Sequence, residues 1–407
     1  MNKHRMNQEF SSFVARLRGL IANRQPATCS RQFSELALEL FALQFAHNSA
    51  YRKICEARGL TPEVVGHWTQ IPAVPTGAFK ELELSCIPPS ERTAVFHSSG
   101  TTEQKPGRHF HCRKSMDLYE DSLWLGFCDN VLSDLRFTIC DLRSETKSAT
   151  GDWQLAILTP LPRQAPHSSL VHMFETVRQK ICAPESVFVG KVMSDGAWAL
   201  DFDAALAALN SSPATRYPPL ILGTAFSFVH LLDFLEENNL KFQLPANSRV
   251  METGGYKNRS RSMPKAELHA LITDRLGVSP ENIVCEYGMS ELSSQAYDSV
   301  ASGEWRVARN RNSRHPSPVT RHFSFPPWAR VQIISPETGC EAADGETGLI
   351  RVFDLANVYS VAAIQTEDLG IRRGDGFELI GRAQLAEQRG CSLMSHSALR
   401  TPHSALR

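Results

Sequence analysis

The sequence predicts a mixed α/β fold with a helical start and a small β region toward the carboxyl end. Apolar residues recur at helical spacing over residues 1 to about 60. From about residue 95 to residue 300, short apolar runs alternate with helical patterns, which is typical of α/β layers with a parallel sheet component. Strand-like segments follow, and 407 residues are enough for a large core in more than one domain.

A helical region and a proline-rich connector are expected over residues 1–90. The prolines from Pro72 to Pro89 interrupt regular structure and indicate an extended connector. The apolar positions at helical spacing are Phe10, Phe13, Val14, Leu17 and Leu20, followed by Leu36, Leu38, Leu40, Phe41 and Phe45.

Residues 91–304 are expected to form the α/β core. Ala94–Phe96, Ala156–Leu158, Pro219–Gly223 and Ile283–Cys285 have the apolar composition of buried strands, and Val229–Glu237 has a helical pattern. Several strands of this kind, separated by helices, predict that part of the sheet is parallel.

Residues 305–381 are expected to form a basic loop followed by a small β subdomain with strands at Val331–Ile334, Gly348–Phe353 and Val358–Ile364. A solvated loop is favoured over a nucleic-acid surface because the rest of the chain is charge-balanced. Residues 382–407 are expected to be a short carboxyl-terminal remnant with a duplicated, disordered tail. The arginines around the loop are Arg306, Arg309, Arg311, Arg314, Arg321 and Arg330.

Composition excludes several classes of function. The 43 basic and 43 acidic residues cancel, so no general attraction to nucleic acid or to an anionic membrane is expected. No apolar run approaches the roughly 20 residues of a membrane span, and Met1 is not followed by a hydrophobic leader, which favours a cytoplasmic protein. Ten cysteines without a Cys-x-x-Cys pair argue against a zinc site or a disulfide framework. His109, His111 and Cys112 are too few ligands to indicate a metal.

A hydroxyl-rich turn over Phe96–Lys105 has the chemistry of a nucleotide phosphate loop, because hydroxyl and backbone N–H groups donate to phosphate oxygens. The motif is not that of P-loop NTPases, since Lys105 stands before Pro106 rather than after a second glycine. An ordinary polar loop is the alternative. The expected donors are Ser98, Ser99, Gly100, Thr101 and Thr102.

Three further motifs follow in order. Glu286–Glu291 places an aromatic ring, a glycine turn, a hydroxyl and a carboxylate after an apolar strand. Gln365–Gly370 is an acidic turn that can accept from ribose hydroxyls, and Gly381–Arg382 supplies a cation shortly afterwards. In this order and spacing the four motifs resemble those of the adenylate-forming enzymes.

Within that superfamily the chain resembles the acyl-protein synthetases of the LuxE type. The resemblance implies the large α/β domain of adenylate-forming enzymes, with layered α/β subdomains and a small β subdomain. Only 25 residues follow Arg382, which implies that the carboxyl-terminal lid domain is largely absent. The narrower match rests on Ile71–Pro75, Phe79–Lys80, Met251–Lys257, Pro326–Trp328 and Arg389–Leu393.

The resemblance implies ATP and Mg²⁺ as cofactors and a carboxylic acid, a fatty acid, as substrate. Lys105 would neutralise phosphate charge, and Glu291 would hold Mg²⁺, because a hard cation prefers carboxylate. Tyr287 would stack on adenine, against which the backbone at Gly254 and Gly255 would lie. An ordinary turn is the alternative for this glycine pair. The remaining implied nucleotide contacts are Gly288, Ser290 with phosphate, Asp368 with ribose, and Arg382 with ribose or phosphate.

Cys391 is the implied acyl acceptor. A thiolate near the carboxyl end can take the acyl group from acyl-adenylate as a thioester, and neighbouring Arg389 could lower its pKa. An incidental tail thiol is the alternative. The implied partner is an acyl-reductase or an acyl-carrier protein. Two departures from the motifs, Glu103 and Glu367, replace glycines of the superfamily and bear on ATP affinity.

Two other functions remain open on the sequence. One is an acyl- or aryl-CoA ligase of the phenylacetate type, or a ligase that joins AMP to a cofactor. The other is a non-catalytic scaffold that binds nucleotide or acyl chains. Hydrolase chemistry is not supported, since no Gly-x-Ser-x-Gly elbow is present. Phe226, Phe228 and Val229 could line an acyl pocket or simply form core.

Overall fold

The computed structural model describes residues 3–23, 30–98, 105–132, 153–181, 186–194, 196–210, 218–254, 263–300 and 321–383. In these ranges, twelve strands form one large sheet. Its neighbours in order are β13 (Ala329–Ile334), β14 (Thr347–Asp354), β15 (Ala363–Arg373), β16 (Gly376–Arg382), β12 (Arg321–Ser324), β11 (Ala296–Val300), β10 (Ile283–Tyr287), β9 (Arg249–Thr253), β8 (Pro219–Thr224), β4 (Gln154–Ile157) and β5 (Val187–Phe188).

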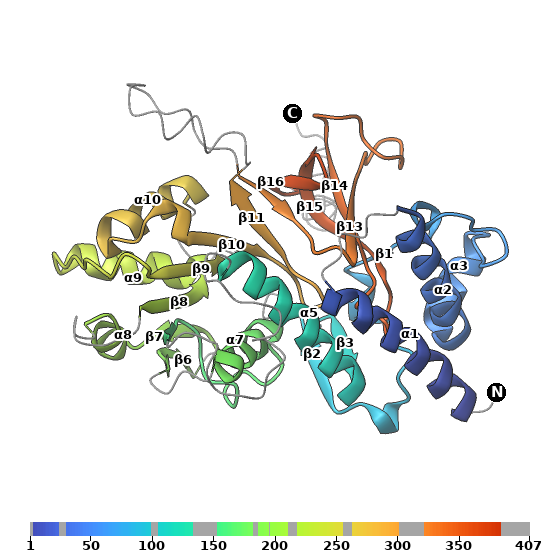
Figure 1. Ribbon diagram of the computed structural model, residues 1–407, viewed down its shortest axis with the longest axis horizontal. Coiled ribbons are helices and arrows are strands. Elements are labelled where there is room, and N and C mark those ends of the chain that lie inside the picture. The colour runs from blue at the N-terminus through green and yellow to red at the C-terminus, as the bar shows by residue number, and fades with distance from the viewer. Residues whose placement is uncertain are drawn as a thin grey trace, which may run out of the picture.

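The strand pairing in the sheet changes from parallel to antiparallel between β10 and β11 (Figure 1). The strands from β5 to β10 are all parallel, as the alternation of strands and helices predicts. From β11 onward the neighbours are antiparallel. The twelfth strand, β1 (Val74–Pro75), pairs in parallel with β15 and joins the amino-terminal connector to the antiparallel part.

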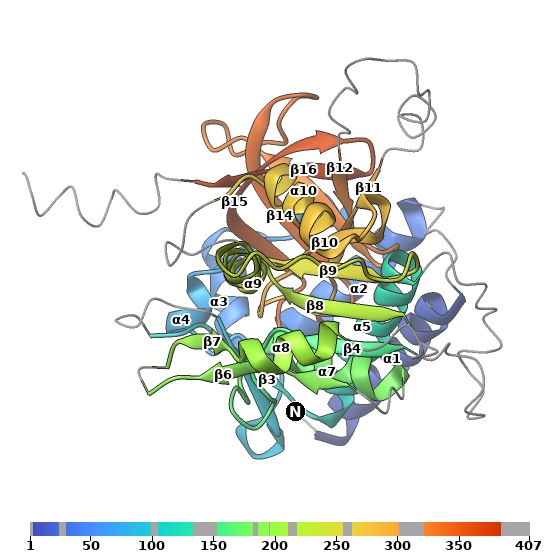
Figure 2. The ribbon, with the colours of Figure 1, turned by 90° about the vertical axis from the view of Figure 1, so that its left-hand side faces the viewer.

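Helices cover both faces of the parallel part. Alternate residues of a strand point to opposite faces, so Leu220 and Leu222 pack with α5 (Arg113–Val131) and α7 (Ser169–Ile181). Ile221 packs on the other face, which is turned toward the viewer in Figure 2. The helices on that face are α8 (Phe202–Leu209), α9 (Ala225–Glu237) and α10 (Lys265–Leu276). Three predicted elements are confirmed. Strand β4 ends one residue before the end of the strand predicted over 156–158, and β8 extends the predicted 219–223 by one residue. Helix α9 contains the helix predicted over 229–237.

The predicted helical start is also confirmed. Helices α1 (Lys3–Asn23), α2 (Ser30–His47) and α3 (Ser49–Ala57) lie at the end of the molecule opposite α8 to α10 (Figure 1). Their apolar residues share a core with the antiparallel strands. The connector contains β1 and the short elements η1 (Trp68–Gln70), α4 (Ala78–Glu81) and η2 (Pro89–Glu91). No helix in the described ranges is long and apolar enough to cross a membrane.

Two hairpins stand outside the large sheet. Strand β2 (Ala94–His97), predicted from its apolar run, pairs with β3 (Arg108–His111) and carries the hydroxyl-rich turn between them. The second hairpin, β6 (Gly190–Val192) with β7 (Trp198–Leu200), lies beside α9.

The strand predicted over Val358–Ile364 is wrong for its first five residues. Strand β15 begins only at Ala363, and residues 358–362 form a tight turn. The Asp354 N–H donates to Ala362 O at 2.9 Å, and the Asn357 N–H donates to Asp354 O at 3.1 Å. The polar groups that start this turn therefore outweigh the apolar pattern that follows them.

The division of the chain at residue 304 stays a prediction, and the sheet is continuous there, because β12 pairs with both β11 and β16. Most of the basic loop, residues 301–320, lies outside the described residues. So does the tail from residue 384 to residue 407.

Asp354 closes the turn after β14 and is fully buried. Its carboxylate accepts from the N–H groups of Ser293 and Ser294 at 2.8 Å, from Ser294 Oγ at 2.7 Å and from Ala356 N–H at 2.9 Å. Burial raises the pKa of Asp354, and these hydrogen bonds act in the opposite direction. A single carboxylate thus joins β14 to the segment that follows Glu291.

Replacing Asp354 with Asn should lower the free energy of unfolding by about 3 kcal/mol. The Asn side chain would point its NH₂ group at buried N–H and O–H groups that are themselves hydrogen-bond donors. Urea denaturation of wild type and variant measures the loss. The matched control is Asp344→Asn, since Asp344 is exposed. Equal stability of Asp354→Asn and Asp344→Asn would contradict the assigned role of Asp354.

Candidate active site

Described residues from all four motifs gather where the parallel part of the sheet, the β2–β3 hairpin and the β15–β16 pair meet. The predicted site residues that the structure describes are Ser98, Lys105, Gly254, Tyr287, Gly288, Ser290, Glu291, Asp368 and Arg382. All of them except Gly254 belong to the four motifs. The remaining predicted residues, Ser99, Gly100, Thr101, Thr102, Gly255 and Cys391, lie outside the described residues, as does Glu103.

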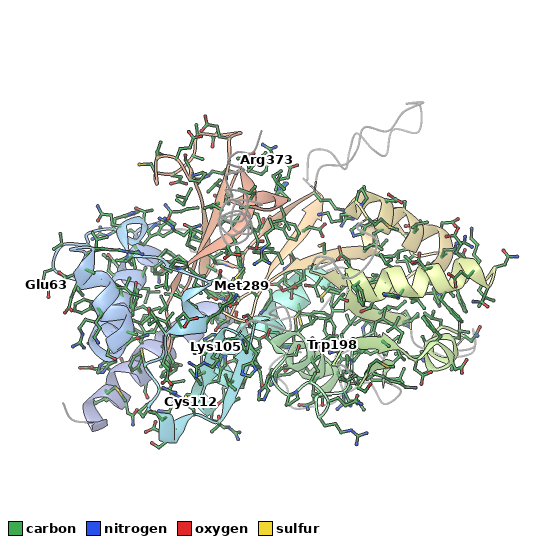
Figure 3. The ribbon with its side chains drawn as sticks, turned by 180° about the vertical axis from the view of Figure 1, so that it is seen from behind. Glu63, Lys105, Cys112, Trp198, Met289 and Arg373 are labelled. Atoms are coloured by element: carbon green, nitrogen blue, oxygen red, sulfur yellow. The ribbon has the colours of Figure 1, made fainter. Side chains whose placement is uncertain are left out.

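The two ends of the hydroxyl-rich turn are bonded to each other. Ser98 N–H donates to Gly107 O at 3.0 Å, and Gly107 N–H donates to Ser98 Oγ at 2.8 Å. A Cβ on Gly107 would lie 2.9 Å from Ser98 Oγ and 3.2 Å from Glu291 Oε1. Only glycine therefore leaves room for the hydroxyl of the first motif and the carboxylate of the second to approach each other. Lys105 is exposed; it lies with Met289 near the middle of the molecule in Figure 3.

Glu291 is buried, and Ser290 Oγ donates to its Oε2 at 3.0 Å. Burial raises the pKa of Glu291, and the positive charges of Lys80 and Arg382 partly offset this. Glu291 is therefore a desolvated carboxylate with two cations in its surroundings.

His109 joins the hairpin to the second motif. Its Nδ1 lies 2.8 Å from Ser290 O, which can only accept, so Nδ1 carries the proton. Burial lowers the pKa of His109 to about 4, so the ring is neutral at physiological pH. The neighbouring His111 Nδ1 lies 3.3 Å from Ser115 Oγ. Within the described residues no group of three His, Cys, Asp or Glu side chains could hold a metal.

Tyr287 and Asp368 form a direct hydrogen bond between the second and third motifs, with Tyr287 Oη donating to Asp368 Oδ2 at 2.9 Å. Burial raises the pKa of both groups. Asp368 lies opposite Arg382 across the β15–β16 pair, and the Arg382 guanidinium donates to Glu367 Oε2 at 2.7 Å. Glu367, a departure from the superfamily motif, is therefore paired with a cation.

Gly254 follows the last residue of β9 and has a φ of +78°. Residues with a side chain rarely adopt this backbone conformation, which explains why glycine stands at this position. At Gly288 a Cβ would collide with the carboxylate of Glu286, which folds over the turn. Glycine is therefore needed at Gly254 for its backbone conformation and at Gly288 for the close approach of Glu286.

Sequence reasoning missed two buried carboxylates at the ends of β9 and β10. Thr253 Oγ1 donates to Glu286 Oε2, and His269 Nε2 lies 3.1 Å from Glu252 Oε1. Burial raises the pKa of Glu286 to about 7. The available signal was an acidic residue directly after an apolar pair or run in each of two strands, 249–253 and 283–287.

A cavity of about 260 Å³ opens beside the carboxyl end of β8. Phe226 and Ser227 of α9 line it together with Trp198 and Leu200 of β7, whereas Phe228 and Val229 are core residues. The other lining residues are Leu158, Ala199, Phe202 and His230. Of the three residues expected to line an acyl pocket or form core, Phe226 therefore lines the cavity, whereas Phe228 and Val229 belong to the core.

Replacing Glu286 with Gln should make stability less dependent on pH. Between pH 4.5 and about 7 the folded protein holds a proton on Glu286 that the unfolded chain releases, so wild-type stability falls as pH rises through this range. The change corresponds to on the order of 3 kcal/mol, and Gln does not titrate. Urea denaturation at pH 5 and pH 8 tests this, with exposed Glu281→Gln as the control. An equal loss of stability between pH 5 and pH 8 in wild type and in Glu286→Gln would contradict the prediction.

Comparisons with known proteins agree on one family. The model of the acyl-protein synthetase family, LuxE, matches residues 177–400. Long-chain-fatty-acid–luciferin-component ligases from Vibrio harveyi and Aliivibrio fischeri are each 22% identical to this chain, covering 90% and 88% of it and 87% and 86% of the relatives.

Solved structures of adenylate-forming ligases share the fold of this chain. A 2-hydroxyisobutyryl-CoA ligase in the postadenylation state matches with a TM-score of 0.59 at 12% identity, covering 88% of this chain and 70% of that one. An open conformation of that enzyme matches with a TM-score of 0.55 at 12% identity, covering 86% and 74%. Both resemblances inferred from the sequence are confirmed: the chain has the fold of adenylate-forming enzymes and is a ligase that belongs to the acyl-protein synthetase family, LuxE.

Proposed function

We propose that this chain activates a fatty acid with ATP and then transfers the acyl group to a cysteine as a thioester. The observation that carries the proposal is the convergence on Glu291 and Asp368 of segments far apart in sequence. Ser98 and Glu291 both lie beside Gly107, and Tyr287 donates a hydrogen bond to Asp368. These are the groups expected to contact phosphate, metal and ribose.

The first step forms an acyl-adenylate. A carboxylate oxygen of the acid attacks the α-phosphorus of ATP, the bond to the bridging oxygen of the β-phosphate breaks, and pyrophosphate leaves. The protein must bind and neutralise negative charge rather than supply a nucleophile. Ser98 and the hydroxyl loop would donate to phosphate oxygens, and Ser290 would support them.

The nucleoside would lie on the other side of the site. Asp368 is held by Tyr287, and its second oxygen would accept from a ribose hydroxyl. Tyr287 would stack on adenine, with the Gly254 and Gly288 backbones close to the ring. Arg382 would lie near ribose or phosphate.

Glu291 fits the proposed Mg²⁺. It is a buried carboxylate, and its Oε1 faces the space at Gly107 that a side chain would fill. A Mg²⁺ bound there would neutralise charge on the phosphates. No other carboxylate of the site is needed, because Mg²⁺ in nucleotide sites usually combines one or two carboxylates with phosphate oxygens and water.

The 260 Å³ cavity lined by Phe226 is the proposed place for part of the acyl chain. Its volume is larger than the ~150 Å³ of a cavity that binds benzene and smaller than the ~300–1,000 Å³ of pockets for drug-sized ligands. It can therefore enclose part of a long chain. The named relatives are ligases of long-chain fatty acids, which favours that class of acid.

In the second step a thiolate attacks the acyl carbonyl, the bond to the AMP oxygen breaks and AMP leaves. Cys391 is the proposed acceptor. Among the described cysteines, burial raises the pKa of Cys55 to about 11 and also raises the pKa values of Cys86 and Cys285, which disfavours their thiolates. The thioester would then serve an acyl-reductase or an acyl-carrier protein.

Acid-dependent exchange of labelled pyrophosphate into ATP tests the first step, across fatty acids of different length and aromatic acids. Wild type should exchange, and Glu291→Ala should lose about 100-fold or more of the rate, because a charge-stabilising group is removed. Exposed Glu281→Ala is the control. Folded wild type without exchange for any acid would favour the non-catalytic scaffold instead.

Acyl labelling in denaturing gels tests the second step. Wild type and Cys340→Ser, which changes an exposed cysteine, should form a stable acyl-enzyme with labelled fatty acid and ATP. Cys391→Ser should still exchange pyrophosphate but form none, because it lacks the acceptor thiolate. A stable acyl-enzyme in Cys391→Ser would rule out this acceptor. Soluble acyl-CoA formed when coenzyme A is added would favour the CoA ligase.

A further inference from the structure

Thr253 and Glu286 form the last pair in the parallel register of β9 and β10. Both side chains are buried, and Thr253 Oγ1 donates a hydrogen bond to Glu286 Oε2. Gly254, with its positive φ, follows Thr253 directly, and Gly288 stands two residues after Glu286. A side-chain hydrogen bond therefore joins β9 to β10 where their pairing ends and two glycine turns begin.

The other carboxyl oxygen of Glu286 lies over the Gly288 turn. A Cβ on Gly288 would collide with Glu286 Oε1 and would stand 3.4 Å from Gln295 Cγ. Gln295 is buried too, so Gly288 is packed against two buried side chains. Because Oε2 accepts from Thr253 while Oε1 packs on Gly288, one carboxyl group spans the distance between the two glycine turns.

The ring of Tyr287 is held by different contacts. Successive side chains of a strand point to opposite faces, so Tyr287 points away from Glu286. The Tyr287 ring lies 5.2 Å from the Phe377 ring, centroid to centroid, and its Oη donates to Asp368. These contacts attach the ring to β15 and β16. The Glu286 carboxyl, in contrast, attaches the backbone of the same segment to β9.

We propose that Glu286 is a positioning residue of the nucleoside site and that it sets the spacing of the Gly254 and Gly288 turns through its hydrogen bond from Thr253. This role rests on the proposed function, in which adenine lies beside both turns. A gap of about 0.5–1 Å already forfeits a quarter to a half of a van der Waals contact. A small separation of the turns would therefore weaken adenine binding, whereas the phosphates are bound by other groups.

Isothermal titration with adenosine and inorganic pyrophosphate as separate probes tests this role. Thr253→Val removes the hydroxyl donor at nearly the same shape, and Glu286→Met removes the acceptor at similar length. Each should weaken adenosine binding by about 10-fold, the effect expected of one lost hydrogen bond to a carboxylate. Pyrophosphate affinity should stay within about twofold of wild type, because distant sites respond independently.

Conservative variants and a matched control accompany these two. Thr253→Ser keeps the donor and Glu286→Gln keeps an acceptor, so both should bind adenosine within about twofold of wild type. Thr347→Val changes an exposed strand threonine on β14 and should leave both affinities unchanged. If Glu286→Met does not fold, the comparison of Thr253→Val with Thr253→Ser decides the question on its own.

The double variant separates positioning from general destabilisation. Thr253→Val combined with Glu286→Met should weaken adenosine binding no further than either change alone, because both remove the same hydrogen bond. Additive losses would overturn the role of Glu286. So would unchanged adenosine affinity in the single variants, or an equal loss for adenosine and pyrophosphate, which a merely structural residue would give. If wild type does not bind adenosine, this role fails; if it binds neither probe, the proposed function fails as well.

Discussion

The Asp354 carboxylate is the constraint on which the site depends. It receives four hydrogen bonds, three of them from Ser293 and Ser294, which lie two and three residues after Glu291. Asn357 adds to this by donating to Glu291 O at 2.8 Å while its Oδ1 accepts from Ser293 Oγ at 2.9 Å. The backbone of the second motif is thus held by the turn between β14 and β15, and the orientation of Glu291 follows from contacts more than sixty residues away in sequence.

The amino-terminal helices complete this arrangement. Gln44 donates to the carbonyl of Asn357 at 2.8 Å and accepts from the Ala362 N–H at 3.0 Å, and Asn48 donates to Ser360 O at 3.4 Å. These side chains are buried, so their hydrogen bonds replace water around a turn that would otherwise leave backbone groups unpaired. The helical region is therefore part of the structural support of the site and not only a cover for the sheet.

Sequence patterns predicted the parts of this molecule that depend on local periodicity. The helices of the first sixty residues, the parallel strands and the order of the motifs all have such signals. The turn at 358–362 could not be predicted, because it is decided by Asp354 and by Gln44, which is distant in sequence. Phe226 and Phe228 are two residues apart, and only the packing of α9 decides which one borders the cavity.

The β2–β3 hairpin depends on its contacts with the rest of the molecule for its place beside the site. A two-stranded hairpin alone is marginally stable in water, and this one shares no strand pairing with the large sheet. Its attachments include His109 with Ser290 O, the backbone bond from His97 N–H to His167 O at 2.9 Å, and the ring of Phe96 against those of Tyr119 and His172. Ser98 and Gly107, at the two ends of the hydroxyl-rich turn, therefore keep their place beside Glu291 through these tertiary contacts and not through the strand ladder of the large sheet.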